Sequence, residues 1–298
     1  MSPSTSPAVQ APANQATSAP ASGRTTSPEA ANERLRAALG ARTRPPAPSA
    51  LSASVTFGWR AIRKIRHVPE QLFDVTAFPV MITLVFTYLL GGALAGSPRA
   101  YVQYLLPGIL LQTVVMITMY TGIALHKDID KGVFDRFRTL PIWRPAAIVG
   151  ALLGDAVRYT LASIVVITLG LVLGFRPGGG VVGVLLGVLV VLVFSFSVSW
   201  VWTMFGLLLR SENAIMGVSM MVLFPLTFGS NIFVDPATMP GWLEAVVRAN
   251  PISHATTAVR GLMAGEATAG DVGLVLLASA GLIAVFGPIT MRLYYRKR

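Results

Sequence analysis

Six long stretches of this 298-residue sequence contain no charged residue. They run from 17 to 33 residues in length, and each is rich in Leu, Val, Ile, Phe and Met. The hydrocarbon core of a bilayer is about 30 Å thick, and a helix needs about 17–25 apolar residues to cross it. The stretches are 75–98, 100–125, 159–175, 177–209, 213–234 and 272–291. The sequence therefore predicts an all-α, polytopic membrane protein with six transmembrane helices.

The overall composition excludes the common soluble classes. Hydrophobic residues make up 53% of the chain and charged residues only 12%, whereas soluble domains carry about 25% charged residues. An ordinary soluble enzyme is therefore excluded. The chain has no cysteine, which also excludes a small secreted domain held together by disulfides.

The distribution of Lys and Arg predicts the orientation of the chain in the membrane. If the N-terminus is cytoplasmic, 15 of the 24 Lys and Arg residues fall in cytoplasmic segments, 4 fall in outer segments, and 5 precede residue 50. Cytoplasmic loops carry an excess of these residues, so we expect both termini on the cytoplasmic side. The net charge of +11 is then explained by contact with anionic lipid, and no nucleic-acid partner is predicted.

The N-terminal part of the chain differs in composition from the rest. Residues 1–50 are rich in Ser, Pro, Ala and Thr and cannot bury a core, so we expect a disordered cytoplasmic tail. Residues 51–298 form the predicted membrane domain. Within it, residues 51–73 begin with an amphipathic pattern that includes Val55, Trp59 and Ile62. This pattern predicts an interfacial helix, which ends near residues 67–70.

The longest predicted cytoplasmic loop carries a second amphipathic pattern. Ile129, Val133, Phe137 and Leu140 recur at spacings of 4, 4 and 3 residues, so they form one apolar stripe on a helix over 126–141. Pro141 ends this helix. The stripe needs a cover, which is either the membrane surface, a neighbouring helix of the same chain, or a groove on a soluble partner. The pattern alone leaves these alternatives open.

The longest predicted outer segment, 235–271, contains two short helices that cannot cross a bilayer. The first covers 242–248 and ends before Asn250 and Pro251. The second begins at Ser253, whose side chain is a suitable N-cap, and reaches Ala264. Both are expected to lie at the outer interface or to enter the membrane and return.

The sequence contains none of the common catalytic motifs. It has no GxxxxGK[ST] phosphate loop, no HExxH and no GxSxG, so we predict neither an enzyme nor a metal or cofactor site. The carboxylates nearest the spans, Asp74 and Asp155, are expected at span edges, which does not favour proton-coupled transport. Asp155 and Arg158 form either a surface ion pair or a joint that transmits motion of the loop. A passive channel, a structural or assembly protein, and the membrane half of a two-part pump all fit these observations.

Several motifs resemble one family in particular. They are 66–74 (RHVPEQLFD) with Pro79 and Gly91–Gly92, 104–108 (YLLPG), 131–141 (KGVFDRFRTLP), 150–155 (GALLGD), and 239–243 (MPGWL) followed by Asn250 and Pro251. Over about residues 55–298 the chain resembles the permease subunits of type-2 ATP-binding-cassette (ABC) exporters, in particular the daunorubicin and doxorubicin resistance permeases of actinobacteria. One departure is Ala151, where the family often has Arg.

The resemblance implies a partner for the amphipathic loop. Each permease would pair with a second copy, as a homodimer, and rest on a separately encoded ATPase that binds the ATP, so the chain itself needs no cofactor. The helix at 51–66 would be an interfacial elbow. The implied ATPase-coupling residues are Lys131, Gly132, Phe134, Asp135, Arg136, Phe137, Arg138, Leu140 and Pro141, together with Pro69 and Glu70.

The resemblance also implies an exported cargo, which is a hydrophobic or amphipathic drug or, alternatively, a lipid, glycolipid or polysaccharide precursor. Polar side chains inside the spans are candidates for the substrate path, although local hydrogen bonds between helices explain them equally well. The candidates are Gln112, Thr113, Thr118 and Tyr120 in the second span and Ser230 and Asn231 in the fifth.

Overall fold

The computed structural model describes residues 29, 32–33, 37, 69–131 and 146–296. All the helices discussed below lie in the larger of two units of the chain, Ala47–Arg298. Within the described residues the secondary structure is helical and contains no strand, which confirms the predicted fold class. The predicted tail, the predicted interfacial helix at 51–66 and loop residues 132–145 lie outside the described residues.

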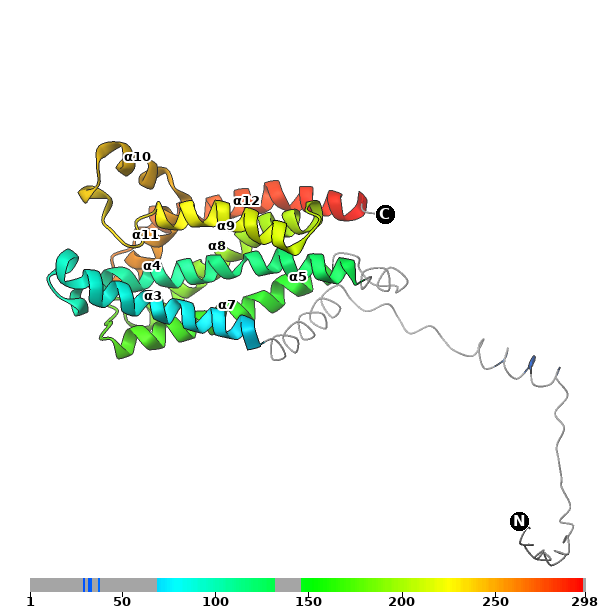
Figure 1. Cartoon of the computed structure of the whole chain (residues 1–298), viewed down its shortest axis with the longest axis horizontal. Coiled ribbons are helices and arrows are strands. Elements are labelled where there is room, and N and C mark those ends of the chain that lie inside the picture. The colour runs from blue at the N-terminus through cyan, green and yellow to red at the C-terminus, as the bar shows by residue number, and fades with distance from the viewer. Residues whose placement is uncertain (1–28, 30–31, 34–36, 38–68, 132–145, 297–298) are drawn as a thin grey trace, which may run out of the picture. The chain divides into compact units, whose positions relative to one another are not determined.

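The helices form an antiparallel bundle (Figure 1). With α4 and α5 counted as one span, successive spans run in opposite directions, so the chain returns to the same end of the bundle after every second span. The long elements are α3 Pro69–Ala95, α4 Pro98–Ile117, α5 Met119–Asp130, α7 Ala146–Val172, α8 Gly180–Leu208, α9 Glu212–Phe228 and α12 Ala269–Arg296. We call the end that holds Lys131, Ala146 and Arg296 the loop end.

The opposite end carries the short elements, which are η1 Pro236–Thr238, α10 Gly241–Ala249 and α11 Pro251–Ala264. We call it the α11 end. α10 and α11 have 9 and 14 residues and are too short to cross a bilayer, as expected. Asn250 precedes α11 as its N-cap, and its Oδ1 accepts a hydrogen bond from the Ile252 amide at 2.9 Å. Asn250, rather than the predicted Ser253, therefore caps this helix. The helix ends at Ala264, and the next residue, Gly265, has a φ of 84° and supplies the left-handed conformation that often follows a helix C-terminus.

Every predicted span coincides with a helix in the structure. Within the described residues, five stretches are long and apolar enough to cross a membrane: Ala77–Ala95, Pro98–Asp130, Gly150–Val172, Gly180–Leu208 and Ala269–Arg296. The fifth predicted span corresponds to α9, which has 17 residues and reaches the lower limit of a spanning helix.

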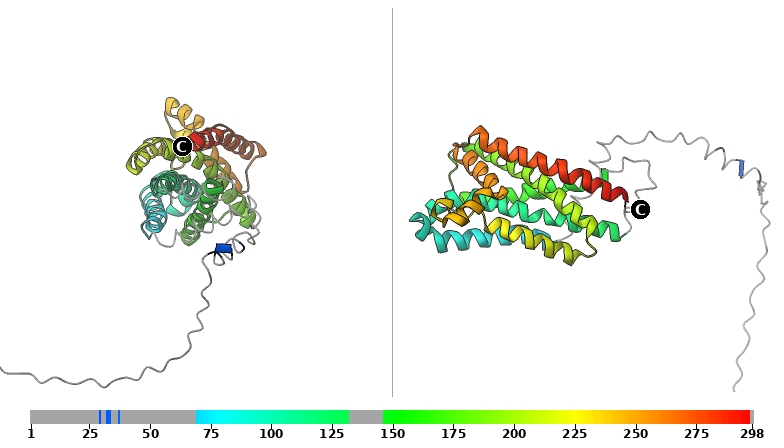
Figure 2. Two further views of the ribbon diagram at one scale, coloured as in Figure 1. Left: turned by 90° about the vertical axis from the view of Figure 1, so that its right-hand side faces the viewer. Right: turned by 90° about the horizontal axis from the view of Figure 1, so that it is seen from above.

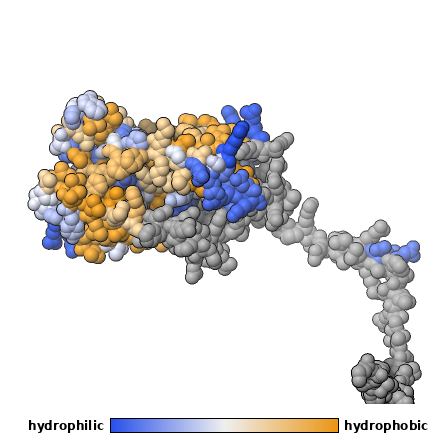
Figure 3. Space-filling model, viewed as in Figure 1, coloured by the Kyte–Doolittle hydropathy of each residue, from blue (hydrophilic) through white to orange (hydrophobic). Residues whose placement is uncertain are grey.

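Apolar side chains cover the middle of the bundle surface, and hydrophilic residues gather toward its ends (Figure 3). Leu89 on α3, Val172 on α7 and Leu277 on α12 are each more than 70% exposed. Large exposed aliphatic side chains of this kind on several helices form the surface that a lipid bilayer covers.

The second span forms the centre of the bundle. In the apolar 18-residue stretch of α4 and α5, 83% is buried inside the protein. In the corresponding stretch of α12, 17% is buried. α4 packs against α3, α7, α8 and α11, and α12 packs mainly on α8 and α11. Figure 2 shows the bundle along its axis, with these helices grouped around a common core.

Three element boundaries differ from the sequence prediction. The second span is interrupted at Thr118 and then continues as α5 to Asp130, so residues 126–130 belong to this helix and do not start a separate cytoplasmic one. α7 begins at Ala146, well before residue 159. α9 ends at Phe228, so Ser230 and Asn231 lie beyond the fifth helix and not in it as predicted.

Candidate functional site

Three of the predicted ATPase-coupling residues, Pro69, Glu70 and Lys131, lie within the described residues, at the loop end. Pro69 and Glu70 are the first residues of α3, and Lys131 is the exposed C-cap of α5. Both places lie at the same end of the bundle (Figure 1). The other predicted coupling residues, Gly132, Phe134, Asp135, Arg136, Phe137, Arg138, Leu140 and Pro141, lie outside the described residues. Their proposed role stays a prediction.

Charged side chains connect neighbouring helices at the loop end. Lys127 on α5 forms an ion pair with Glu212 on α9, with 2.8 Å between Nζ and Oε2. One residue earlier, Nδ1 of the buried His126 lies 3.2 Å from the carbonyl oxygen of Gly206 on α8. Its Nε2 lies 3.3 Å from Oδ2 of Asp130. In this conformation these contacts attach the end of α5 to α8 and α9.

Most of the predicted substrate-path residues of the second span are buried inside a single chain. Gln112, Thr113 and Thr118 are at most 4% exposed, and Tyr120 is half-buried. The hydroxyl of Thr118 donates to the carbonyl of Val115 at 2.6 Å. Gln112 Nε2 has no hydrogen-bond partner within the described part of the chain. In this conformation these side chains lie within the helix packing, and their place on a substrate path stays a prediction.

Of the two candidates after α9, Asn231 forms a polar junction with α11, and Ser230 bonds back to α9. The Ser230 hydroxyl donates to the carbonyl of Thr227 at 2.5 Å. Asn231 Nδ2 donates to the Thr257 hydroxyl at 2.8 Å, and its backbone amide donates to the Ser253 hydroxyl at 3.2 Å. The structure therefore joins Asn231 to α11, whereas Thr118 lies at the break between α4 and α5.

Arg260 on α11 completes this junction, and it was not predicted from the sequence. Its guanidinium carbon lies 3.7 Å from the centre of the Tyr104 ring. Its Nε and Nη2 donate to the carbonyls of Tyr104 and Asn231 at 3.1 and 3.0 Å. Burial lowers the pKa of Arg260, and the neighbouring Tyr104 and Asp235 oppose that shift. An arginine retains its charge in such a setting, so the residue acts as a fixed donor that holds two backbone segments together.

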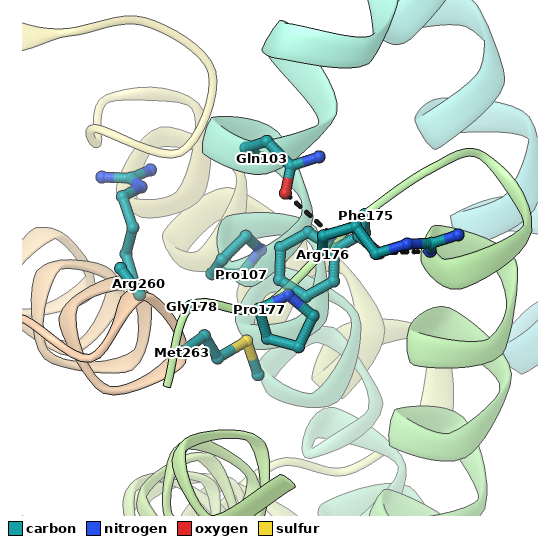
Figure 4. Close-up of a pocket in the computed structure, with 9 residues that line it drawn as sticks. Gln103, Pro107, Phe175, Arg176, Pro177, Gly178, Arg260 and Met263 are labelled. Carbon is teal, nitrogen blue, oxygen red and sulfur yellow. Dashed lines mark hydrogen bonds between the residues drawn. The ribbon is translucent and has the colours of Figure 1, made fainter. Parts of the chain in front are cut away.

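A cavity of about 190 Å³ opens beside this junction (Figure 4). Gln103 forms one side of it, with Nε2 donating to the carbonyl of Gly174 at 2.9 Å and Oε1 accepting from the Arg176 amide at 2.9 Å. The guanidinium groups of Arg176 and Arg260 point away from each other in this view. The remaining lining residues are Pro107, Phe175, Pro177, Gly178, Met263 and Ala264. The cavity is mostly apolar, and no pattern in the sequence predicted it.

The described residues contain no group of three or more His, Cys, Asp or Glu side chains that could hold a metal ion. The polar groups at both ends of the bundle bind backbone groups or one another. Within the described residues, the candidate site is therefore this set of polar contacts between helices.

A comparison with known protein families decides the class of this bundle. The family model for ABC-2 type transporters matches residues 53–264. The chain belongs to the ABC-2 type transporter family. The match begins before α3 and ends at the last residue of α11, so it includes the whole α11 end and the loop between α5 and α7.

Two named relatives show how this ABC-2 chain compares with known permeases. It is 54% identical over 263 residues to the daunorubicin resistance ABC transporter permease protein DrrB1 of Streptomyces coeruleorubidus, covering 88% of this chain and 93% of that protein. It is 24% identical over 221 residues to the probable doxorubicin resistance ABC transporter permease protein DrrC of Mycobacterium tuberculosis, covering 74% of this chain and 79% of that one. The chain is thus a multi-pass ABC-2 permease of the cell membrane, similar to antibiotic resistance permeases, and the resemblance seen in its motifs is confirmed.

Proposed function

We propose that the chain is the permease subunit of an exporter that moves a hydrophobic or amphipathic drug out of the cell. ATP hydrolysed by a separate ATPase subunit would drive the movement, and two copies of the permease would enclose the path. The observation that carries this proposal is the 54% identity, over most of both chains, to a permease named for daunorubicin resistance.

The charge pattern and the arrangement of the helices support the proposed orientation. Of the Lys and Arg residues after residue 50, 15 fall in segments that the prediction makes cytoplasmic. The structure gathers the start of α3, the stems of the 131–145 loop and the end of α12 at one end of the bundle (Figure 1). A cytoplasmic loop end would offer all of these segments to a soluble ATPase.

The loop sequence supports a specific docking mode. Phe137 lies on the predicted apolar stripe and Phe134 flanks it, so we propose that both rings enter an apolar groove on the ATPase. Arg136 and Arg138 would pair with acidic groups beside that groove, and Pro69 and Glu70 would contact the same subunit. Docking can transmit work only if its free energy differs between the inward-facing and outward-facing states.

The double substitution Phe134→Ala with Phe137→Ala tests this docking mode. Burial of a Phe side chain contributes about 1.5–3 kcal/mol, so we expect ATP-dependent transport to fall by about tenfold or more while membrane insertion is unchanged. The matched control is Phe134→Leu with Phe137→Leu, which keeps apolar side chains and should retain most of the activity. Normal transport and normal co-purification of the ATPase with the Ala variant would contradict the proposal.

The function itself is tested in inside-out vesicles that contain the permease and its ATPase subunit. We expect uptake of daunorubicin that requires ATP and stops when the ATPase is inactivated. Uptake that does not need ATP would indicate a channel. ATP-dependent movement of a labelled lipid or glycolipid without movement of any drug would assign a different cargo. No movement of any probe would indicate a structural or assembly protein.

A further inference from the structure

The half of the second span that is nearer the loop end is a separate helix, α5, and a hinge joins it to α4. α5 has 12 residues and is about 18 Å long at 1.5 Å per residue. At the break, the Thr118 amide donates to the carbonyl of Val115 and the Thr121 amide donates to the carbonyl of Thr118, both at 3.1 Å. Both hydrogen bonds join residues three apart in the sequence, as in a 3₁₀ helix. A short 3₁₀ stretch within a helix often marks a hinge.

A side chain from another helix holds this hinge in place. The indole N–H of Trp202 on α8 donates to the Thr118 hydroxyl at 2.8 Å, and both residues are at most 2% exposed. Thr118 is neither Gly nor Pro, so its own sequence does not impose the break. The contact with Trp202 therefore places the hinge at a fixed point on α8.

Just beyond the hinge, α5 is attached to α7 by a buried polar cluster. The Thr121 hydroxyl donates to Oδ2 of Asp155 at 2.6 Å and lies 3.3 Å from the hydroxyl of Tyr159. Oδ1 of Asp155 lies 3.1 Å from Nη1 of Arg158. All four residues are at most 8% exposed. The ion pair that the sequence placed at the edge of a span is thus inside the bundle, and so is the carboxylate of Asp155.

The ion pair lies within one helix, so it does not by itself connect two helices. Desolvation offsets most of the attraction of a buried ion pair, and apolar residues often replace such pairs without loss of stability. What the pair provides is a charged acceptor inside the bundle, and a hydrogen bond to a charged acceptor is stronger than a neutral one. The Thr121–Asp155 bond is therefore the contact through which the pair acts on α5.

Contacts with α8 and α9 guide α5 along the rest of its length. A Cβ atom on Gly122 would lie 2.3 Å from the carbonyl oxygen of Trp202, and one on Gly206 would lie 2.4 Å from the carbonyl oxygen of Gly122. The backbones of α5 and α8 thus touch without a side chain between them. Nearer the loop end, the Lys127–Glu212 ion pair attaches α5 to α9.

We propose that α5 moves as one lever, hinged at Thr118, and that Thr121, Tyr159, Asp155 and Arg158 are positioning residues that latch it to α7 in one transport state and release it in the other. The lever ends where the proposed coupling loop begins, and α7 starts where that loop returns. The latch therefore joins α5 and α7, the two helices that flank the proposed coupling loop. This inference rests on the proposed function, because it assigns the latch a place in an ATP-driven cycle.

A latch of this kind affects coupling more than stability. If the Thr121–Asp155 bond exists in one state, its loss shifts the balance between states by about ten- to a hundredfold, the range expected for a charge-assisted hydrogen bond. ATP hydrolysis by the partner continues, but fewer hydrolysis events move the lever and the spans together. The quantity to measure is the number of cargo molecules transported per ATP hydrolysed.

The first experiment uses the full complex of permease and ATPase in liposomes. Thr121→Val removes the hydroxyl with little change of shape, and Thr121→Ser restores it. Thr160→Val is the matched control, because the Thr160 hydroxyl donates at 2.8 Å to Ala156, within its own helix. We expect Thr121→Val to lower transport per ATP about tenfold, with ATP hydrolysis within about twofold of wild type. Thr121→Ser and Thr160→Val should keep the wild-type ratio.

Three results would distinguish a failure of the latch from a failure of the proposed exporter function. If Thr121→Val transports and hydrolyses like wild type, the latch is wrong. If transport and hydrolysis fall together, in proportion to the folded fraction, the cluster is structural only and the latch is again wrong. A wild-type complex that shows no ATP-dependent transport of any cargo would overturn the proposed function, and with it the latch.

A second measurement follows the movement of α5 directly. The chain contains no cysteine, so Lys127→Cys with Glu212→Cys introduces the only thiols. Both native side chains are 40% exposed and lie outside the latch. We expect a short bifunctional thiol reagent to cross-link this pair with yields that differ severalfold between the nucleotide-free complex and the vanadate-trapped complex. Equal yields in the two states would overturn the lever.

Discussion

The two ends of the bundle are held by different kinds of contact. At the α11 end, polar side chains bind backbone carbonyls: Tyr104 and Arg260 both donate to Asn231, and Asn250 Nδ2 donates to Leu226 and Gly229. Between the hinge and the loop end, side chains from different helices also bind one another, as in the Lys127–Glu212 pair and the Thr121–Asp155 bond, beside the contact of His126 with the Gly206 carbonyl.

This difference predicts which end moves. A buried backbone carbonyl that loses its donor carries a desolvation penalty of about 1–3 kcal/mol, so the α11 end favours one geometry. At the loop end the half-exposed Lys127–Glu212 pair can separate and bind water, because the backbone groups of both residues lie within helices. We therefore expect substitutions at the α11 end to affect stability and substitutions at the loop end to affect coupling.

The largest effect expected at the α11 end comes from Asn250→Ala. It removes the two bonds to the carbonyls of Leu226 and Gly229 and the cap of α11. With about 1 kcal/mol for each bond and about 1 kcal/mol for the cap, the free energy of unfolding should fall by about 2–4 kcal/mol. Thermal unfolding in detergent measures the loss. Asn250→Ser keeps a capping oxygen and should recover about a third of it. An unchanged melting temperature would show that this end is not fixed by these bonds.

An intermediate effect is expected for Tyr104→Phe. The variant loses the hydrogen bond from the Tyr104 hydroxyl to the carbonyl of Asn231, which measures 2.9 Å. Arg260 still donates to that carbonyl and still stacks on the ring, so we expect a loss of about 0.5–1.5 kcal/mol in stability. Transport per ATP should not change. Tyr88→Phe is the control, because Tyr88 is 65% exposed. A fall in transport per ATP at full stability would contradict the assignment of this end to structure.

The smallest effect on stability is expected for Lys127→Ala. The ion pair with Glu212 is 40% exposed on each side, and exposed pairs contribute about 0.2–1 kcal/mol, less at high salt. The melting temperature should hardly change. The exchanged pair, Lys127→Glu with Glu212→Lys, should behave like wild type. A loss of several kcal/mol would mean that the loop end is as rigid as the α11 end.

The sequence predicts the course of the chain well because lipid imposes strict conditions on each span. A helix that crosses a bilayer must be long and almost free of charge, and six uncharged stretches meet this condition. The same condition says nothing about where a helix bends. The break at Thr118 falls inside an apolar run, and a contact with Trp202, far away in the sequence, fixes it.

The other errors have a similar origin. The sequence placed Asp155 at the edge of a span because an isolated carboxylate is unfavourable in lipid, yet Arg158 and Thr121 allow it to lie inside. The uncharged run that contains α9 continues past Phe228, but Asn250 binds the carbonyls at the end of that helix. In the sequence, Arg260 entered only the count of Lys and Arg residues in outer segments. Its role in the structure depends on Tyr104, which is 156 residues away.

The short length of α9 has a consequence for the surrounding bilayer. A helix of 17 residues extends about 26 Å, less than the hydrocarbon thickness of about 30 Å. Lipid beside a short span adapts by local thinning. The residues that follow do not lengthen this helix: α9 ends at Phe228, and the backbone of Asn231 is bonded inward to Tyr104, Arg260 and Ser253. An amphipathic molecule would therefore meet a thinner membrane beside α9 than beside the 28-residue α12.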